Sequence, residues 1–378
     1  MASVNIIKFL DKYLGYLLCL FLSANKIFPT KKKIEYKKIL IIQLWGIGET
    51  ILTLPAIKAL RGNNKKSKID ILVTNRVKEI FYNNKNIDNL IVIKLNPISI
   101  LGFIIKNYRS YDLIIDMEEY LNVSSIIAFF AGKERIGYSH GIRSNLHTKK
   151  INYNDKQHVA ETFLDLVRAL GIKYELKNLE KLDYSKEDRN VVDKFLKDKK
   201  IAKKDFIVGL TPGAAESAKS RMWPLDNYAE VCNNILSNKK NKIIFIGNKD
   251  EDKLIKKIQS DIKEKNRTFN TAGLFNLNGL FCLVEKCNLF ISNDAGAMHI
   301  AAAQGVKTIG LFGPNLPKRF APYGKKNVAI YKGEICQYSP CINVHKGQVP
   351  DCLYPKNSKD YQKCMKNIKV VDVLKFIK

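Results

Sequence analysis

Short apolar runs alternate along the chain with longer stretches in which apolar residues recur every three or four positions. The runs predict buried strands, which in the first half cover Ile39–Leu44, Ile69–Val73, Leu90–Ile93 and Leu113–Asp116. The helical stretches cover Glu49–Leu60, Val77–Tyr82 and His158–Leu170. Strands that alternate with helices predict a parallel sheet whose two faces are both covered.

The alternation restarts after a charge-rich stretch, Tyr174 to Lys204, which contains a predicted helix at Lys186–Lys199. The second series of strands covers Phe206–Leu210, Lys242–Ile246, Leu289–Ser292 and Thr308–Phe312, with helices over Leu225–Leu236, Asp252–Ile262 and Ala297–Gln304. We therefore expect an N-terminal segment 1–37, two α/β domains at 38–200 and 201–360, and a closing amphipathic helix 361–378 that packs back on the first domain. Ligands bind beyond the carboxyl ends of such strands, so the expected site is a cleft between the domains.

The N-terminal segment has a helical pattern of its own. The thirteen residues from Tyr13 to Asn25 carry no charge, whereas a helix that spans a bilayer needs about 20 apolar residues. Polar or small residues form one narrow stripe on the predicted helix: Asn5, Lys8, Lys12, Gly15, Cys19, Ser23 and Lys26. This pattern, followed by the basic run Lys31–Lys33, is typical of a helix in a membrane interface. A helix packed on the protein's own core is the alternative. A cleaved signal peptide is a third, which Asp11 disfavours.

Composition and charge narrow the class of partner. The 378 residues are 46% hydrophobic and 26% charged, which is typical of a globular protein. The formal net charge is +28, which is either a solvated lysine surface or a basic face for an anionic partner. No Arg-rich block, RNA-binding signature or zinc-finger spacing is present, so a phosphorylated substrate or an anionic membrane surface is favoured over nucleic acid.

The glycine turn after the first predicted strand raises the question of a dinucleotide site. Gly46 and Gly48 have the spacing of the dinucleotide fingerprint, but Ile51 stands where its third glycine is needed. No acidic residue ends the next strand, so the pattern argues against a nicotinamide or flavin enzyme. Glu49 begins the following helix, either as a charge that favours the helix dipole, worth ~0.3–1 kcal/mol, or as a base that faces the cleft.

The second domain carries the stronger signals of an anion site. Asn293 and Asp294 end a strand, and Ala295 and Gly296 begin a helix whose free N–H groups favour a bound anion. His299 follows on the first turns of this helix, where it is placed to touch phosphate or sugar.

A loop earlier in this domain adds cations to the expected site. Gly213 follows the strand Phe206–Leu210, and Lys219 and Arg221 follow in the loop, where two cations are suited to hold a diphosphate. Either cation alone is usually just a charge on a solvated loop. Glu251, after the strand Lys242–Ile246, is a candidate for ribose hydroxyl groups.

The eight cysteines fall into two groups. Cys19, Cys232, Cys282 and Cys287 lie in apolar patterns and are expected to be buried thiols. The other four cluster toward the end of the chain: Cys336, Cys341, Cys352 and Cys364. Their spacing is not that of zinc-ribbon pairs, and it leaves open a structural metal site, a disulfide set or neither.

Taken together, these motifs resemble the bacterial heptosyltransferases of glycosyltransferase family 9, from about Lys38 to the C-terminus. The matching motifs are Gly46-Ile47-Gly48-Glu49, Thr53-Leu54-Pro55, Arg221 with Trp223-Pro224, Asp294 with Gly296 and His299, and Phe312-Gly313-Pro314. The resemblance implies a GT-B fold, that is, two Rossmann-like domains with the donor nucleotide on the second. It also implies metal-independent, inverting transfer of a sugar from ADP-heptose to a lipid-linked glycan of the lipopolysaccharide core, at the inner face of the cytoplasmic membrane, with no cofactor.

The resemblance implies roles for individual residues, and the sequence departs from the family pattern at three positions. Glu49 would be the base, and Arg221, Lys219 and the helix start at Gly296 would stabilise the leaving diphosphate. Glu49 stands where the family usually has Asp, Arg221 where it has Lys, and Ala295 where it has Thr or Ser. Two alternatives are therefore kept, namely a nucleotide-sugar epimerase and a catalytically silent nucleotide- or sugar-binding relative. A cytosolic enzyme of this kind disfavours disulfides between the four C-terminal cysteines.

Overall fold

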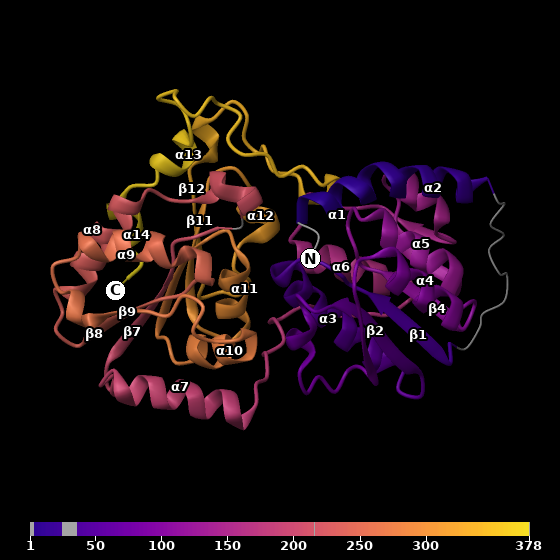
Figure 1. Ribbon diagram of the computed structural model, residues 1–378, viewed down its shortest axis with the longest axis horizontal. Helices are drawn as coiled ribbons and strands as arrows, with labels where there is room; N and C mark the ends of the chain where they lie inside the picture. Colours follow the sequence, from indigo (N-terminus) through magenta and orange to yellow (C-terminus); the bar gives the residue numbers. More distant parts are fainter. Residues whose placement is uncertain (1–3, 25–35, 215, 378) are drawn as a thin grey trace. The chain divides into compact units, whose positions relative to one another are not determined.

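The computed structural model describes residues 4–24, 36–214 and 216–377 (Figure 1). The chain divides into two compact units. Unit 1 contains Met1–Leu176 and Val344–Gly347, and unit 2 contains Lys177–Asn343 and Gln348–Lys378. The basic run Lys31–Lys33 lies outside the described residues.

Unit 1 is built on a six-stranded parallel sheet in the order β3-β2-β1-β4-β5-β6. Its strands are β1 (Lys38–Ile42), β2 (Lys68–Thr74), β3 (Asn89–Ile93), β4 (Tyr111–Asp116), β5 (Gly132–Tyr138) and β6 (Lys149–Ile151). The central strand β1 is flanked by β2 and β4, with Ile39 beside Ile69 and Leu113. The buried apolar runs of the sequence are these central strands, which are covered on both faces.

Helices cover both faces of this sheet. α3 (Ile47–Asn63) and α6 (Val159–Arg168) pack together, as do α4 (Pro97–Lys106) and α5 (Asn122–Ala131), which share a core cluster with Leu40 and Ile42 of β1. Between β2 and β3 the predicted helix is only a 3-10 turn, η2 (Lys78–Phe81).

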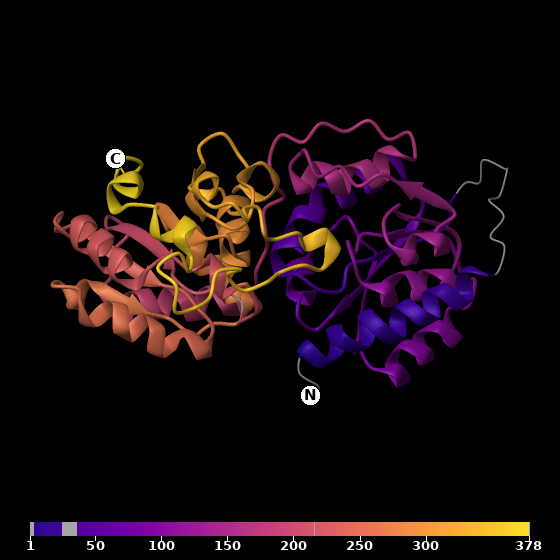
Figure 2. The ribbon, with the colours of Figure 1, turned by 90° about the horizontal axis from the view of Figure 1, so that it is seen from above.

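The N-terminal segment forms α1 (Val4–Leu10), a π-helical turn η1 (Asp11–Gly15) and α2 (Tyr16–Ser23), which run in line as one indigo rod in Figure 2. The rod packs on α5 through small residues of its polar stripe, because Gly15 and Cys19 are buried there and a Cβ at Gly15 would lie 2.9 Å from the Asn122 Cβ. Asp11 accepts hydrogen bonds from the N–H groups of Asn122 and Val123, at 3.0 and 2.8 Å, and so caps α5. The large apolar residues of the rod are therefore left on its outer side.

Unit 2 repeats the architecture of unit 1. Its sheet has the order β12-β11-β10-β7-β8-β9, all parallel. The strands are β7 (Phe206–Thr211), β8 (Asn241–Phe245), β9 (Thr268–Asn270), β10 (Leu289–Asn293), β11 (Lys307–Phe312) and β12 (Val328–Tyr331). The helices are α7 (Lys186–Asp198), α8 (Leu225–Leu236), α9 (Asp252–Ser260), α10 (Leu277–Glu285), α11 (Gly296–Ala303) and α12 (Pro317–Phe320).

Two predictions about domain limits differ from the structure. The boundary expected near residue 200 places α7 in the first domain, whereas α7 belongs to unit 2 because it packs against α10. The closing helix 361–378 is two short helices, α13 (Lys363–Lys366) and α14 (Val370–Leu374). They belong to unit 2 and not to the first domain, because α14 packs on α8 and the Trp223 indole donates to the Ile368 carbonyl between the two helices, at 2.8 Å.

Candidate active site

The strand order of each sheet indicates where a ligand binds. Both sheets have the order of doubly wound folds, in which winding reverses between two central strands and ligands bind beyond their carboxyl ends. The reversal lies between β1 and β4 in unit 1 and between β7 and β10 in unit 2. The predicted residues follow these strands: Gly46 and Glu49 come after β1, Gly213 after β7, and Asp294 after β10.

In unit 2 the buried side chain of Asn293 ties the site together. Its amide N–H groups donate to the carbonyls of Pro212 and Gly213, at 2.8 and 3.2 Å. Its oxygen accepts from the Trp223 N–H at 3.2 Å and from the Tyr228 hydroxyl at 2.9 Å. Four of its hydrogen-bonding contacts thus join the ends of β7 and β10 to the start of α8. The sequence alone identifies Asn293 only as one of two polar residues that end a strand.

Asp294 and Arg221 contact each other next to Asn293. The Arg221 Nη1 lies 3.3 Å from the Asp294 carboxylate and donates to the Asp294 carbonyl at 3.1 Å. The buried Asn315 amide also donates to the Asp294 carboxylate, at 2.8 Å. Lys219 lies on the same short turn as Arg221 but its side chain is exposed. The structure therefore brings Arg221 and Asp294 together and leaves Lys219 in solvent.

The start of α11 lies next to Asp294. Its N-cap residue, Ala295, is extended and supplies no side-chain hydrogen bond, so the first N–H groups of the helix receive no side-chain cap. Gly296 opens the helix, and His299 is buried on it. This geometry is suited to an anion held by backbone N–H groups.

Glu251 reaches the Gly213 turn. A Cβ at Gly213 would lie 1.6 Å from its Oε1, so only glycine permits this approach. Its Oε2 accepts from the Asn248 N–H at 2.7 Å. Burial raises the pKa of Glu251, although the Asn248 hydrogen bond opposes the shift.

In unit 1 the turn after β1 holds Glu49 close to its own backbone. Gly46 caps α3, and its carbonyl accepts from the Thr50 N–H at 2.9 Å and the Thr50 hydroxyl at 2.6 Å. A Cβ at Gly46 would lie 1.8 Å from the Glu49 carboxylate, which is half-buried above it. Gly48 is buried in the first turn of the helix. Both interpretations of Glu49, helix-start charge and base, fit this position.

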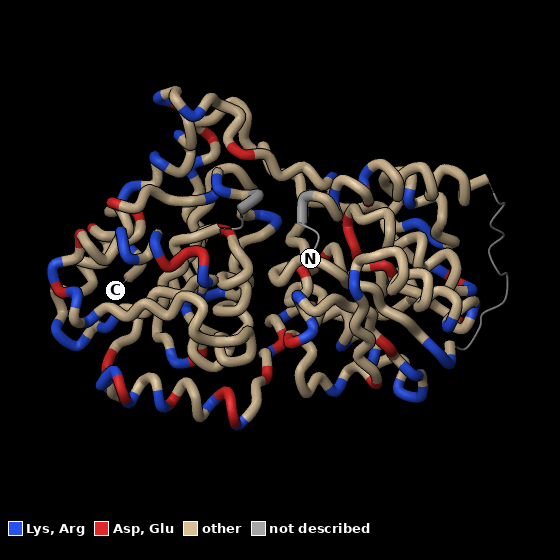
Figure 3. The backbone as a smooth tube through the Cα atoms, viewed as in Figure 1, with Lys and Arg blue, Asp and Glu red and all other residues tan. Residues whose placement is uncertain are grey.

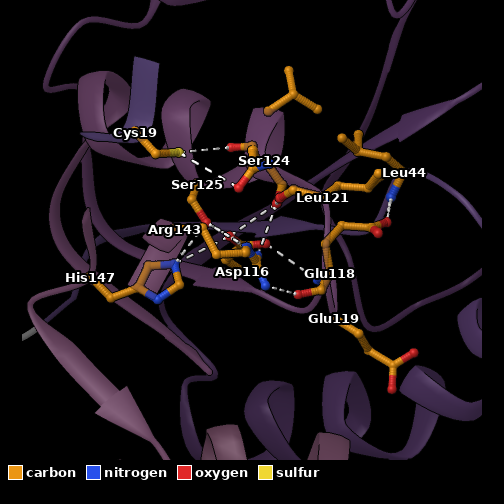
Figure 4. Close-up of polar contacts among 12 residues, drawn as sticks. Cys19, Leu44, Asp116, Glu118, Glu119, Leu121, Ser124, Ser125, Arg143 and His147 are labelled. Atoms are coloured by element: carbon orange, nitrogen blue, oxygen red, sulfur yellow. Dashed lines mark hydrogen bonds and ion pairs between the residues drawn. The ribbon is translucent and has the colours of Figure 1, made fainter. Parts of the chain in front are cut away.

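A carboxylate that the sequence analysis missed lies beside the same turn. Glu118 follows β4, and its carboxyl group accepts a hydrogen bond from the N–H group of Leu44 (Figure 4) and another from that of Trp45. Burial raises its pKa to about 8, although the Leu44 hydrogen bond opposes the shift. The acidic pair Glu118-Glu119, directly after a predicted strand, was the available signal.

Next to Glu118 lies a buried ion pair. The Arg143 Nη2 is 2.6 Å from the Asp116 carboxylate, and both side chains are buried. Burial alone would raise the pKa of Asp116, but the Arg143 guanidinium and the His147 ring lower it to about 2. Arg143 comes from η3 (Ile142–Leu146), far from β4 in sequence.

The four C-terminal cysteines line one small pocket of unit 2, together with Tyr338 and Tyr354. All four are free thiols, so none of the disulfides left open by the spacing is present. In the described part of the chain, no three His, Cys, Asp or Glu side chains are arranged to hold a metal ion.

These features define a two-unit α/β protein with a candidate anion site at the start of α11 on its second unit and buried or half-buried carboxylates on its first. Residues 105–347, more than half of the chain, match the model of glycosyltransferase family 9 (heptosyltransferase). The chain therefore belongs to glycosyltransferase family 9 and is a glycosyltransferase.

Individual relatives agree with this assignment. The chain is 24% identical over 329 residues to lipooligosaccharide heptosyltransferase 2 of Campylobacter jejuni, which covers 87% of this chain and 93% of the relative. It is 25% identical over 321 residues to the enzyme of the same name from Haemophilus ducreyi, covering 78% and 88%. Its fold matches the glycosyltransferase family 9 structure from Veillonella parvula, with a TM-score of 0.75, 22% identity and coverage of 91% and 97%. The two Rossmann-like sheets expected for the GT-B class are thus confirmed.

Proposed function

We propose that this protein moves a heptose, with inversion, from ADP-heptose to a lipopolysaccharide core or related envelope glycan. The observation that carries the proposal is the Arg221–Asp294 pair beside the start of α11, at the winding reversal of unit 2. The names of the relatives support heptose as the sugar, and a solved Escherichia coli relative is described as an ADP-heptose enzyme. The family that the chain matches is a transferase family, which favours this function over the epimerase and the silent binding protein.

In this mechanism side chains and backbone groups of the protein remove the proton and stabilise the leaving group. Glu49 takes the proton from the acceptor hydroxyl as that oxygen attacks the anomeric carbon. The bond from the sugar to the diphosphate breaks, and Arg221, Lys219 and the α11 N–H groups stabilise the negative charge that develops on ADP. Asp294 and His299 contact the donor, and Glu251 accepts from ribose hydroxyl groups. No metal ion or cofactor takes part in these steps.

The nucleotide assignment predicts selective stabilisation by ADP. At 100 times its dissociation constant, ADP should add about 2.7 kcal/mol to the free energy of unfolding, and UDP, GDP and CDP should add little. Thermal unfolding of the purified protein with each nucleotide measures this. Arg221→Ala should abolish the shift, whereas Arg267→Ala, an arginine of unit 2 with a similarly buried side chain (13% exposed against 15%), should keep it. A shift with another nucleotide alone, or an unchanged shift in Arg221→Ala, would contradict the donor site.

We also propose that the N-terminal rod holds the protein on an anionic membrane surface, at the inner face of the cytoplasmic membrane where a lipid-linked acceptor lies. The rod exposes large apolar residues along its outer side: Ile6, Phe9, Leu10, Tyr13, Leu14, Tyr16, Leu17, Leu18, Leu20 and Phe21. A helix of a globular protein normally buries such residues and exposes its polar side. Helix α4, which packs on α5 as the rod does, exposes Ile98, Leu101 and Ile105.

The charge and length of the segment suit this surface attachment. Within residues 4–24, 36–214 and 216–377, no helix has both the length and the apolar character needed to cross a bilayer. Lys8 and Lys12 lie on the rod, and Lys and Arg occur on elements of both units (Figure 3). Interfacial helices combine buried apolar area with attraction to anionic lipid in this way.

Membrane attachment predicts vesicle binding that depends on the outer side of the rod. The protein should cosediment with vesicles that contain anionic lipid more strongly than with zwitterionic vesicles. Leu17→Asp should weaken binding at least 10-fold, because burying one such side chain is worth about 1.5–3 kcal/mol. Leu274→Asp is the matched control, since Leu274 of unit 2 is 58% exposed and Leu17 is 59% exposed. Equal loss in the two variants, or no vesicle binding, would argue against the rod as an anchor.

A further inference from the structure

We propose that Glu118 is a positioning residue for sugar transfer, because its carboxyl group fixes the backbone of the turn that carries Glu49. The inference rests on the proposed role of Glu49 as the base. It adds a residue of unit 1 that acts through the turn and does not touch the reacting atoms.

The first support is the place where the β1 ladder ends. The Gln43 N–H still donates to the Leu72 carbonyl, at 3.0 Å, as part of the sheet. The next two N–H groups, those of Leu44 and Trp45, both point to one oxygen of Glu118. Since Leu44 is buried, its N–H would have no water to replace this acceptor. Glu118 therefore replaces the sheet carbonyls as the hydrogen-bond acceptor at the point where the chain leaves β1.

Glu118 is itself held rigidly. Its N–H donates to the Asp116 carboxylate at 3.2 Å, and its carbonyl accepts from the Arg143 Nη1 at 2.6 Å. Asp116 and Arg143 form the buried ion pair, and Ser125 bridges them by donating to Asp116 at 2.7 Å and accepting from Arg143 at 3.0 Å (Figure 4). A carboxyl group with this support transmits the position of β4 to the turn.

The turn after β1 also fixes the position of Glu49. Trp45 is followed directly by Gly46, whose carbonyl accepts both Thr50 hydrogen bonds and whose Cα lies against the Glu49 carboxylate. A change in the path of Leu44 and Trp45 therefore moves the start of α3. A displacement of about 1 Å at a reacting group is enough to slow a reaction about 100-fold.

Two substitutions separate positioning from a direct proton transfer by Glu118. Glu118→Gln keeps an oxygen that accepts the two N–H groups but does not titrate, and Glu118→Ala removes it. Asp70→Ala is the matched control, because Asp70 of β2 is another carboxylate of unit 1 that is 3% exposed, as Glu118 is. Asp70 accepts from Asn89 and Tyr111, at 2.6 and 3.0 Å, and neither of these two partners lies on the turn that carries Glu49.

The assay measures transfer from ADP-heptose to a lipopolysaccharide core that lacks heptose, per molecule competent to bind ADP. In Glu118→Ala kcat should fall about 100-fold, with the KM for ADP-heptose unchanged. Glu118→Gln should keep kcat within about threefold of the parent. In a Glu49→Gln background, Glu118→Ala should cause no further loss, because the two residues act on one step. If Glu118→Gln is as slow as Glu118→Ala, or the loss is the same in the Glu49→Gln background, positioning is wrong.

A measurement without turnover separates this inference from the proposed function. The protein has two tryptophans, and Trp223 is buried whereas Trp45 is half-buried on the turn. Acrylamide quenching of the fluorescence therefore reports mainly on Trp45. Quenching should increase in Glu118→Ala and stay at the parent level in Glu118→Gln and Asp70→Ala. If the parent protein transfers no heptose, the proposed function fails, and equal quenching in all four proteins would overturn the positioning role by itself.

Discussion

Replacement of Glu49 by glutamine is expected to slow sugar transfer about 10²–10⁴-fold, the usual contribution of a general base. Glutamine keeps the length of the side chain and its approach to Gly46, so the turn and the site of unit 2 should remain formed. What is lost is the basic carboxylate that takes the proton of the acceptor hydroxyl, because an amide oxygen is a far weaker base. Steady-state transfer from ADP-heptose, with ADP-induced thermal stabilisation on the same samples, measures both properties.

The competing interpretation of Glu49 has a direct control. Glu161 is also a first-turn glutamate of a unit 1 helix, α6. The dipole contribution of such a charge is about 0.3–1 kcal/mol of stability, so Glu161→Gln should lose a little stability and no transfer. Should Glu49→Gln behave like Glu161→Gln, Glu49 is a helix-start charge and another group is the base.

The sequence predicted those parts of the fold that depend on local pattern. The eight predicted strands are present, because a run such as Ile39–Ile42 is apolar at consecutive buried positions of a central parallel strand. Glycine and polar residues that follow these strands also located Gly46, Gly213 and Asp294, since the carboxyl end of a strand is where such folds bind ligands. The prediction of one closing helix was wrong, because the helical structure breaks between α13 and α14, where the Ile368 carbonyl accepts from the Trp223 indole. Local periodicity does not show such a contact with a distant residue.

The missed part of the site depends on contacts between distant segments. Arg143 is 27 residues from Asp116, and Glu118 is 73 residues from Trp45. No local pattern indicates that these residues meet. The pairing of β1 with β4 brings Glu118 to Trp45, and Arg143 reaches Asp116 from η3, which follows β5, the strand that pairs with β4. The N-terminal rod shows the same limit. Its periodicity predicted a stripe correctly, but only the packing on α5 shows that the small residues face inward and the large apolar ones outward.

The buried ion pair beside Glu118 predicts the largest effect on stability. Arg143→Ala should lower the free energy of unfolding by about 3–5 kcal/mol, because it leaves the Asp116 charge buried without its partner. Urea denaturation at neutral pH measures this. Arg168→Ala, an arginine of the same unit whose ion pairs with Glu161 and Asp165 are partly exposed, is the control, and about 0–1 kcal/mol is expected.

The pH dependence gives this prediction a second check. In the parent protein the pKa of Asp116 is lowered to about 2 from an ordinary value of 3.8, so the stabilisation is complete above pH 4 and is lost as the pH falls toward 2. Without Arg143, burial raises the pKa of Asp116. In acid the carboxyl group is then protonated, which removes the cost of a buried unpaired charge in the variant. The difference in stability between the two proteins should therefore shrink as the pH is lowered. The prediction would be wrong if this difference stayed constant with pH, or if Arg143→Ala lost no more stability than Arg168→Ala. Either result would mean that the Arg143–Asp116 pair does not stabilise the region around Glu118.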